Sequence, residues 1–125
     1  MIKPFKVDIS EKILLNIYSK VKNYEWHEIP DDGGWDYGTN LDYMKEFSKY
    51  WVEKFNWRKT EEKINRFKNF KTKINGVEIH FIHEKGSGVN PKPLLLSHGW
   101  PGSIIEFLHI IDQLAHPEKF GGKEE

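Results

Sequence analysis

The sequence predicts an α/β fold in which a helical N-terminal segment, residues 1–68, precedes strands and a helix in residues 69–125. Two observations carry this prediction. In the first half of the chain apolar residues recur at spacings of three and four, the period of an amphipathic helix. After residue 68 the pattern changes to short extended runs separated by turn residues, and one further amphipathic run follows them.

The first helix is expected over residues 8–22. Asp8 is the candidate N-cap, and Glu11 three residues later gives the start the form of a capping box. The spacing of the apolar residues places them on one face of the helix. These residues are Ile9, Ile13, Leu14, Ile17 and Val21.

Residues 23–39 are expected to be irregular, because they contain a dense cluster of turn residues. The cluster consists of Pro30, Asp31, Asp32, Gly33 and Gly34. Asp31 and Asp32 also permit an interpretation as paired catalytic carboxylates, but the adjacent glycines favour a turn role. The aromatic residues of this segment, Trp26, Trp35 and Tyr37, are expected to pin the loop onto a core.

A second helix is expected over residues 41–55, capped by Asn40 or Thr39, and a third, shorter one over 57–67, with Ile64 facing inward. The second helix carries a largely aromatic stripe. An aromatic stripe at helical spacing is interpreted as core rather than as a cofactor site. Its members are Leu41, Met44, Phe47, Trp51 and Phe55.

Residues 70–74 and 77–84 are predicted to form a hairpin, because Asn75-Gly76 between them supplies the two positive φ angles of a type I′ turn. A loop with Gly86, Ser87, Gly88, Asn90 and Pro91 follows. The apolar run at 93–97 predicts a strand buried on both faces. A helix is expected over 104–115, and His116-Pro117 ends it.

Composition excludes several classes of function. Lys plus Arg and Asp plus Glu both number 19, so net charge gives no argument for binding nucleic acid. The chain has no cysteine, which excludes thiol catalysis and disulfides. No run of roughly 18 apolar residues is present, and the first residues do not form a signal peptide. No metal site is expected, because His80 and His83 lie on opposite faces of a strand.

Chemistry is most plausible at the turn His98-Gly99-Trp100-Pro101-Gly102-Ser103, which joins a predicted buried strand to a helix. In α/β-hydrolases a loop at this place supplies one backbone N–H to a developing negative oxygen. Gly99 permits close backbone approach, and the Trp100–Pro101 bond is open to the cis isomer. The alternative is a tight turn without a catalytic role. His98 is interpreted as an orienting or turn-bonding group rather than a base, and Ser97 and Ser103 lack the surroundings of a hydrolase nucleophile.

Several segments together resemble the microsomal epoxide hydrolase family, and the sequence of residues 35–40 resembles its juvenile hormone branch in particular. The resemblance runs from Pro4-Phe5 to Leu114 and keeps the order of the family's N-terminal region. The segments are Trp35-Asp36-Tyr37-Gly38-Thr39-Asn40, Tyr50-Trp51, Phe55-Asn56-Trp57-Arg58, Phe70-Lys71-Thr72-Lys73-Ile74, Ile79-His80-Phe81-Ile82-His83, residues 93–103 and Glu106-Phe107.

The resemblance implies an enzyme that opens an epoxide to a vicinal diol with water and no cofactor. An aspartate forms an ester with an epoxide carbon, two lid tyrosines bind the epoxide oxygen, and a histidine backed by an acid activates the water that cleaves the ester. The oxyanion loop corresponds to His98, Gly99, Trp100 and Pro101, with the Trp100 N–H as donor. The helical front segment is implied to wrap around the hydrolase core and its lid.

The chain ends at Glu125, before the aspartate, the tyrosines and the catalytic histidine of the family, so it is expected to be inactive alone. It is then the front part of an epoxide hydrolase with an incomplete α/β-hydrolase fold, or else a non-catalytic binding module derived from one. Another α/β-hydrolase is disfavoured by the long helical front. The implied partner is an apolar epoxide, and the implied location is the endoplasmic reticulum membrane, although the family's anchor is absent. The exposed edge of the strand at 93–97 predicts self-association and marginal stability.

Overall fold

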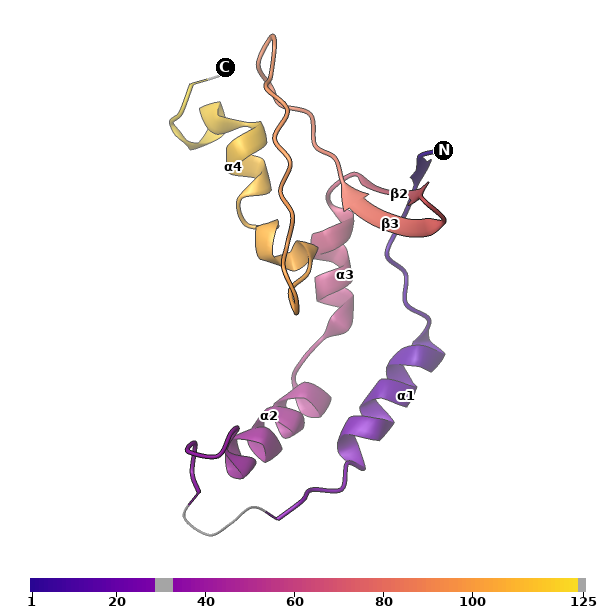
Figure 1. Cartoon of the computed structure of the whole chain (residues 1–125), viewed down its shortest axis with the longest axis vertical. Coiled ribbons are helices and arrows are strands. Elements are labelled where there is room, and N and C mark those ends of the chain that lie inside the picture. The colour runs from indigo at the N-terminus through magenta and orange to yellow at the C-terminus, as the bar shows by residue number, and fades with distance from the viewer. Residues whose placement is uncertain (29–32, 124–125) are drawn as a thin grey trace. The chain divides into compact units, whose positions relative to one another are not determined.

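The computed structural model of the protein describes residues 1–28 and 33–123, so Asp31 and Asp32 lie outside the described residues. Nine elements follow one another along the described residues, and Figure 1 labels the longer ones. The strands are β1 (Lys3–Pro4), β2 (Asn69–Ile74) and β3 (Val77–Ile82). The α-helices are α1 (Glu11–Lys22), α2 (Leu41–Glu53), α3 (Trp57–Asn65) and α4 (Ile111–Ala115). The 3₁₀ helices are η1 (Ile104–Phe107) and η2 (Pro117–Phe120).

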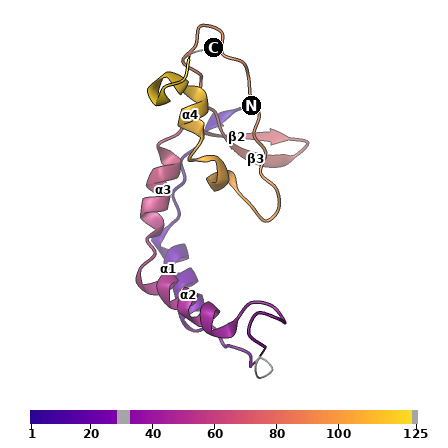
Figure 2. The ribbon, with the colours of Figure 1, turned by 90° about the vertical axis from the view of Figure 1, so that its left-hand side faces the viewer.

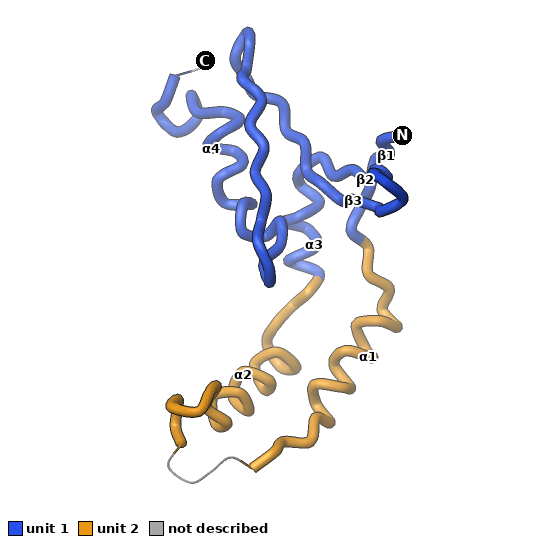
Figure 3. Tube along the Cα trace, viewed as in Figure 1, with its two compact units in different colours: residues 1–7, 58–125 blue, residues 8–57 orange. Residues whose placement is uncertain are grey.

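These elements fall into two compact units, one formed by residues 8–57 and the other by residues 1–7 together with 58–125 (Figure 3). The N-terminal residues join the second unit because β1 pairs with β2. That short strand was not expected from the sequence, since two residues carry no readable periodicity. The predicted helices at 8–22, 41–55 and 57–67 are confirmed within one or two residues at most ends.

In the unit of residues 8–57, helices α1 and α2 contact each other. Helix α1 begins differently from the expectation. Its N-cap is Ser10 rather than Asp8, and no side-chain hydrogen bond caps it, so the predicted capping box is wrong. Glu11 is therefore the first helical residue, where its charge complements the helix dipole. Leu14, 7% exposed, is the buried apolar residue of this helix.

Helix α2 begins as predicted, because the Asn40 side chain accepts a hydrogen bond from the Tyr43 N–H at 2.9 Å. Two residues of its predicted stripe, Phe47 and Trp51, take part in a ladder of ring contacts. The ladder also includes Tyr43 of α2 and Trp35, which precedes the helix. The centroid distances are 5.3 Å from Trp35 to Tyr43, 6.3 Å from Tyr43 to Phe47 and 6.3 Å from Phe47 to Trp51. Within this chain the ladder is not a buried core, since Phe47 remains 45% exposed.

The other unit is built on an antiparallel sheet in the order β1-β2-β3, whose two longer strands form a hairpin that Figure 2 shows. The turn between them is the predicted one, because Asn75 has φ 50° and Gly76 has φ 83°. The register places Phe70 opposite Phe81, and their rings stack at 5.6 Å. This cross-strand aromatic pair stabilises the hairpin.

Helix α3 and the start of β2 provide the buried centre of this unit. Ile64 and Phe67 are 4% and 5% exposed, so the inward orientation predicted for Ile64 is confirmed. Asn69, also 4% exposed, donates to the carbonyls of Ile64 and Phe67 at 2.9 and 2.8 Å. Its amide thereby satisfies the Phe67 carbonyl just after α3 and adds a second donor to the Ile64 carbonyl, which also accepts from the Phe67 N–H at 3.2 Å.

The strand predicted at 93–97 does not form among the described residues. The segment is not in regular structure, and Leu94 and Leu95 are 65% and 91% exposed. A strand buried on both faces requires a strand partner and covering helices, and the described residues place neither against it.

The helix predicted over 104–115 is also wrong as a single element, because it divides into η1 and α4. Most helical stability comes from packing of the apolar face. Here Ile105 and Leu114 remain 44% and 52% exposed, so that stabilisation is missing. The predicted end is confirmed, since α4 stops at Ala115 and Pro117 starts the separate η2.

Candidate functional site

The candidate site is the turn at residues 98–103. It contains the four predicted oxyanion-loop residues together with Gly102 and Ser103, and we call the whole turn the oxyanion loop. The Trp100–Pro101 peptide bond is cis, as the sequence allowed. The Gly102 N–H donates to the Gly99 carbonyl at 2.6 Å, which closes the backbone around Trp100 and Pro101. Trp100 itself is 99% exposed, so its side chain contributes no packing within this chain.

A second set of hydrogen bonds holds the exit of the oxyanion loop. Ser103 is the N-cap of η1, and its hydroxyl accepts from the Ile105 N–H at 3.3 Å. The Glu106 carboxylate reaches back and accepts from the Ser103 N–H at 3.1 Å. Together these bonds form a capping box. This role of Glu106 was not predicted, although the spacing Ser103-Ile104-Ile105-Glu106 matches the capping-box pattern.

Some backbone N–H groups of the oxyanion loop donate hydrogen bonds within the chain, and others have no acceptor in its described part. Gly102 and Ser103 direct their N–H groups to partners within the loop and η1. Within residues 1–28 and 33–123, the N–H of Trp100 meets no hydrogen-bond acceptor. A backbone N–H on a closed turn is the kind of donor that stabilises a developing oxyanion. The N–H groups of His98 and Gly99 also meet no acceptor among the described residues, but the Trp100 N–H is the one inside the turn that the Gly102–Gly99 bond closes.

His98 takes part only in a local contact, in which its Nδ1 lies 3.3 Å from the Gly99 carbonyl. The two histidines considered as metal ligands, His80 and His83, have different contacts. His80 is half-buried and its Nε2 lies 2.9 Å from Asn69 Oδ1. His83 is exposed, with its ring 6.5 Å from that of Phe70. In the part of the chain that the structure describes, no group of three or more possible ligands gathers around a metal site.

The tautomer of His80 follows from its partner. Both donated hydrogen bonds of Asn69 go to the carbonyls at the end of α3, so Oδ1 is the atom that faces His80. The Nε2 of His80 therefore carries a hydrogen and donates it. Burial, followed by the positive charge of Lys71, lowers the pKa of His80 below its usual value. The ring of Phe5 packs edge-on against it at 5.1 Å.

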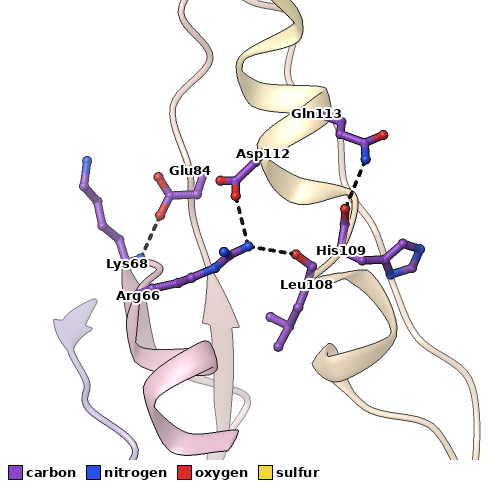
Figure 4. A network of polar contacts seen from close by, with 7 residues as sticks. All are labelled: Arg66, Lys68, Glu84, Leu108, His109, Asp112 and Gln113. Atoms are coloured by element: carbon purple, nitrogen blue, oxygen red, sulfur yellow. Dashed lines mark hydrogen bonds and ion pairs between the residues drawn. The ribbon is translucent and has the colours of Figure 1, made fainter. Parts of the chain in front are cut away.

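The segment after the oxyanion loop is attached to the end of α3 by a polar network (Figure 4). Arg66 pairs with Asp112 at 2.9 Å and donates to the Leu108 carbonyl at 3.4 Å. Beside it, the Lys68 N–H donates to Glu84 at 2.8 Å. Arg66 and Asp112 are both partly solvated, so their ion pair contributes at most about 1 kcal/mol. The network orients η1 and α4 without burying them.

Another contact fixes the loop that precedes the oxyanion loop. The Ser87 N–H donates to the Ala115 carbonyl at 2.9 Å, and the Ser87 hydroxyl lies 2.7 Å from a Glu118 oxygen. The hydrogen bond from Ser87 lowers the pKa of the Glu118 carboxyl. Residues on both sides of the oxyanion loop are thus attached within the same unit.

The hairpin, the extended apolar segment and the His-Gly-Trp-Pro turn that leads into helical structure are together the start of an α/β-hydrolase fold, as the comparisons with solved structures confirm. The family model described as "Epoxide hydrolase N terminus" matches residues 2–107. The chain therefore belongs to the epoxide hydrolase N terminus family, and the family resemblance read from the sequence is confirmed.

Relatives named epoxide hydrolase and relatives named juvenile hormone epoxide hydrolase both match nearly the whole chain. Epoxide hydrolase 1 of Sus scrofa is 40% identical over 99% of this chain, and juvenile hormone epoxide hydrolase 1 of Ctenocephalides felis is 37% identical over 93%. The crystal structure of juvenile hormone epoxide hydrolase from Bombyx mori superposes with a TM-score of 0.83 at 36% identity over 91% of this chain. The chain spans only 28, 26 and 28% of these three proteins, respectively.

No helix among residues 1–28 and 33–123 combines the length and apolar character that crossing a membrane requires.

Proposed function

We propose that this chain forms the N-terminal part of an epoxide hydrolase and supplies one oxyanion donor, the backbone N–H of Trp100. The observation that carries the proposal is the available Trp100 N–H on a turn closed by the bond from Gly102 to Gly99. The family match supports it, because the turn lies inside the matched residues. None of the relatives named above favours the alternative of a non-catalytic binding module.

The proposed chemistry has two steps. An aspartate outside residues 1–125 opens the epoxide and becomes an ester, and water then attacks that ester. The second step places negative charge on the ester's carbonyl oxygen, and a preorganised N–H stabilises that charge in a water-poor site. Loss of one such donor slows catalysis by about 100- to 1,000-fold. The Trp100 N–H therefore acts in ester hydrolysis rather than in epoxide opening.

The proposed substrate class is an apolar epoxide, as the names of the relatives indicate for those proteins. Juvenile hormones and foreign epoxides both belong to this class. We also propose the endoplasmic reticulum membrane as the location, and a functional division into a wrapping segment, residues 1–68, and the start of the hydrolase core, residues 69–125. The oxyanion loop with His98, Gly99, Trp100 and Pro101 lies in the second part.

A chimaera tests the catalytic role of Trp100. The present chain replaces the matching N-terminal segment of the Bombyx mori enzyme, and styrene oxide is the substrate. Rapid-quench kinetics measure ester formation and ester hydrolysis separately. In Trp100→Pro, which has no N–H, we expect ester formation to continue and ester hydrolysis to fall by about 100-fold or more. Trp100→Phe keeps the N–H and is expected to hydrolyse the ester at the parent rate.

Two results would contradict the proposal. One is a Trp100→Pro chimaera that hydrolyses the ester as fast as its parent. The other is a folded parent chimaera that forms no diol. The isolated chain, which holds neither the aspartate nor its histidine, is expected to form no diol above the background of its own Trp100→Pro variant.

A further inference from the structure

The Glu106 carboxylate does more than cap a short helix. It accepts from the Ser103 N–H at 3.1 Å, while the Glu106 N–H donates back to the Ser103 carbonyl at 3.1 Å. Ser103 and Glu106 are thus joined by two hydrogen bonds in opposite directions. This pair lies directly after Gly102, the residue whose N–H closes the oxyanion loop.

The carboxylate also covers Gly102. A Cβ atom added to Gly102 would overlap the Glu106 carboxylate and would lie 2.9 Å from the Gly99 carbonyl oxygen. The side chain of Glu106 therefore occupies the space that only glycine leaves open at this position. Any larger residue at 102 must displace the carboxylate from Ser103 and press on the bond that closes the loop.

These contacts form a continuous path to the donor. Glu106 holds Ser103 and covers Gly102, Gly102 binds the Gly99 carbonyl, and Gly99 is joined to Trp100 by the peptide unit that carries the Trp100 N–H. The direction of that N–H is fixed by the orientation of this peptide plane. A change at Glu106 can reach the donor through these contacts without touching the substrate.

We propose that Glu106 is a positioning residue that sets the direction of the Trp100 N–H by clamping residues 102–103. The inference rests on the proposed function of Trp100. It assigns to Glu106 a role in the rate of ester hydrolysis and none in epoxide opening. The carboxylate acts as a hydrogen-bond acceptor, so its charge is dispensable, and glutamine, which also serves in capping boxes, replaces it.

The kinetic test uses the chimaera described above with four substitutions. Glu106→Ala and Gly102→Ala both remove the clamp, Glu106→Gln retains the acceptor, and Glu62→Ala alters an exposed glutamate on α3 as a control. For the two clamp variants we expect ester hydrolysis to slow about fivefold. This is the factor that corresponds to the free energy contributed by a typical helix cap. Ester formation and the KM for styrene oxide are expected to stay at the parent values. Glu106→Gln and Glu62→Ala are expected to match the parent.

The proposal is overturned if Glu106→Ala hydrolyses the ester at the parent rate, or if Glu106→Gln is as slow as Glu106→Ala. A second readout does not depend on catalysis. In the ¹⁵N-labelled chain of residues 1–125, heteronuclear NOE values report the order of the Gly99, Trp100 and Gly102 amides. We expect them to fall in Glu106→Ala and to recover in Glu106→Gln, and unchanged values in Glu106→Ala overturn the clamp.

The two proposals fail in different ways. If Trp100→Pro leaves ester hydrolysis unchanged while Glu106→Ala loosens the loop, the proposed function is wrong and the clamp is only structural. If Trp100→Pro blocks hydrolysis while Glu106→Ala changes neither rate nor NOE values, the proposed function stands and the positioning role of Glu106 is wrong.

Discussion

Replacement of Asn69 is expected to destabilise the unit of residues 1–7 and 58–125 by removing hydrogen bonds from its buried centre. Asn69 is 4% exposed and makes three hydrogen bonds, donating to Ile64 and Phe67 and accepting from His80. In Asn69→Ala the Phe67 carbonyl loses its donor inside the protein, whereas the Ile64 carbonyl keeps one, the Phe67 N–H at 3.2 Å. Leaving a buried polar group unsatisfied costs about 1–3 kcal/mol, and the half-buried His80 is the less costly of the two groups that lose their partner. We expect a total loss of about 3 kcal/mol.

Urea unfolding followed by far-UV circular dichroism measures this loss. With an m-value of about 1.5 kcal/mol/M, typical of a small protein, the midpoint should fall by about 2 M. Amide hydrogen exchange of the β2 and β3 amides gives the same information if the variant is already partly unfolded in water. Lys73→Ala, on an exposed position of the same strand, is the control and should stay within about 0.5 kcal/mol of the parent.

Asn69→Asp separates hydrogen bonding from packing. Aspartate has the shape of asparagine but has no N–H to donate, so its oxygens would face the carbonyls of Ile64 and Phe67. It should destabilise the unit at least as much as alanine. If Asn69→Asp or Asn69→Ala unfolds within about 0.3 M of the parent midpoint, the donated hydrogen bonds do not stabilise this unit as argued.

Three further predictions concern other features. The folded-state pKa of His80 is lowered, so as the pH falls the unfolded chain takes up the proton first. The contribution of His80 to stability is therefore complete above about pH 6.5 and is lost as the pH falls from there through the folded-state pKa. The difference between the urea midpoints at pH 7.5 and pH 5.5 should be smaller in His80→Gln than in the parent. Gly76→Ala, at φ 83° in open space, should cost about 1–2 kcal/mol by the same assay, whereas Asn75→Gly should be neutral or stabilising. Leu95→Lys, at a site that is 91% exposed, should reduce self-association in sedimentation experiments without lowering the urea midpoint.

The elements that the sequence predicted correctly are those whose cause is local. Asn75-Gly76 requires only its own φ angles to form a hairpin turn, and Asn40 requires only an N–H three residues away. The boundary at Ser10 shows the limit of the same reasoning. Asp8 and Ser10 are both residue types that favour the N-cap position. They lie two residues apart, and capping preference alone does not determine which of them begins the helix.

The elements that the sequence predicted wrongly depend on contacts that lie far along the chain. The composition of the segment Leu94, Leu95 and Leu96 is that of a buried strand. Composition shows which environment would suit a segment, but it does not show whether neighbouring strands and helices provide that environment. The division of the helix at 104–115 has the same origin, because its apolar stripe meets too little surface to stabilise a long helix. The short β1 was missed for the opposite reason, since its pairing with β2 spans more than sixty residues and leaves no local trace.

At the candidate site the sequence identified the turn but not what holds it. Gly99 and Pro101 were singled out for backbone geometry, and the cis bond after Trp100 agrees with that reasoning. Glu106 was noted only as part of the family resemblance. Its bond to Ser103 follows a known spacing pattern, yet the overlap with Gly102 is a three-dimensional fact that no spacing predicts.

The oxyanion loop and the leucine segment before it differ in what they need. The loop closes through bonds within eight residues, from Gly99 to Glu106, and these bonds form whether or not a neighbouring strand is present. The leucine segment becomes a strand only when another strand supplies backbone partners and other elements cover its side chains. The loop geometry is therefore encoded locally, whereas its placement opposite a nucleophile depends on the strand. This separation explains how a chain that spans 28% of the Bombyx mori enzyme holds an ordered donor without an ordered sheet around it.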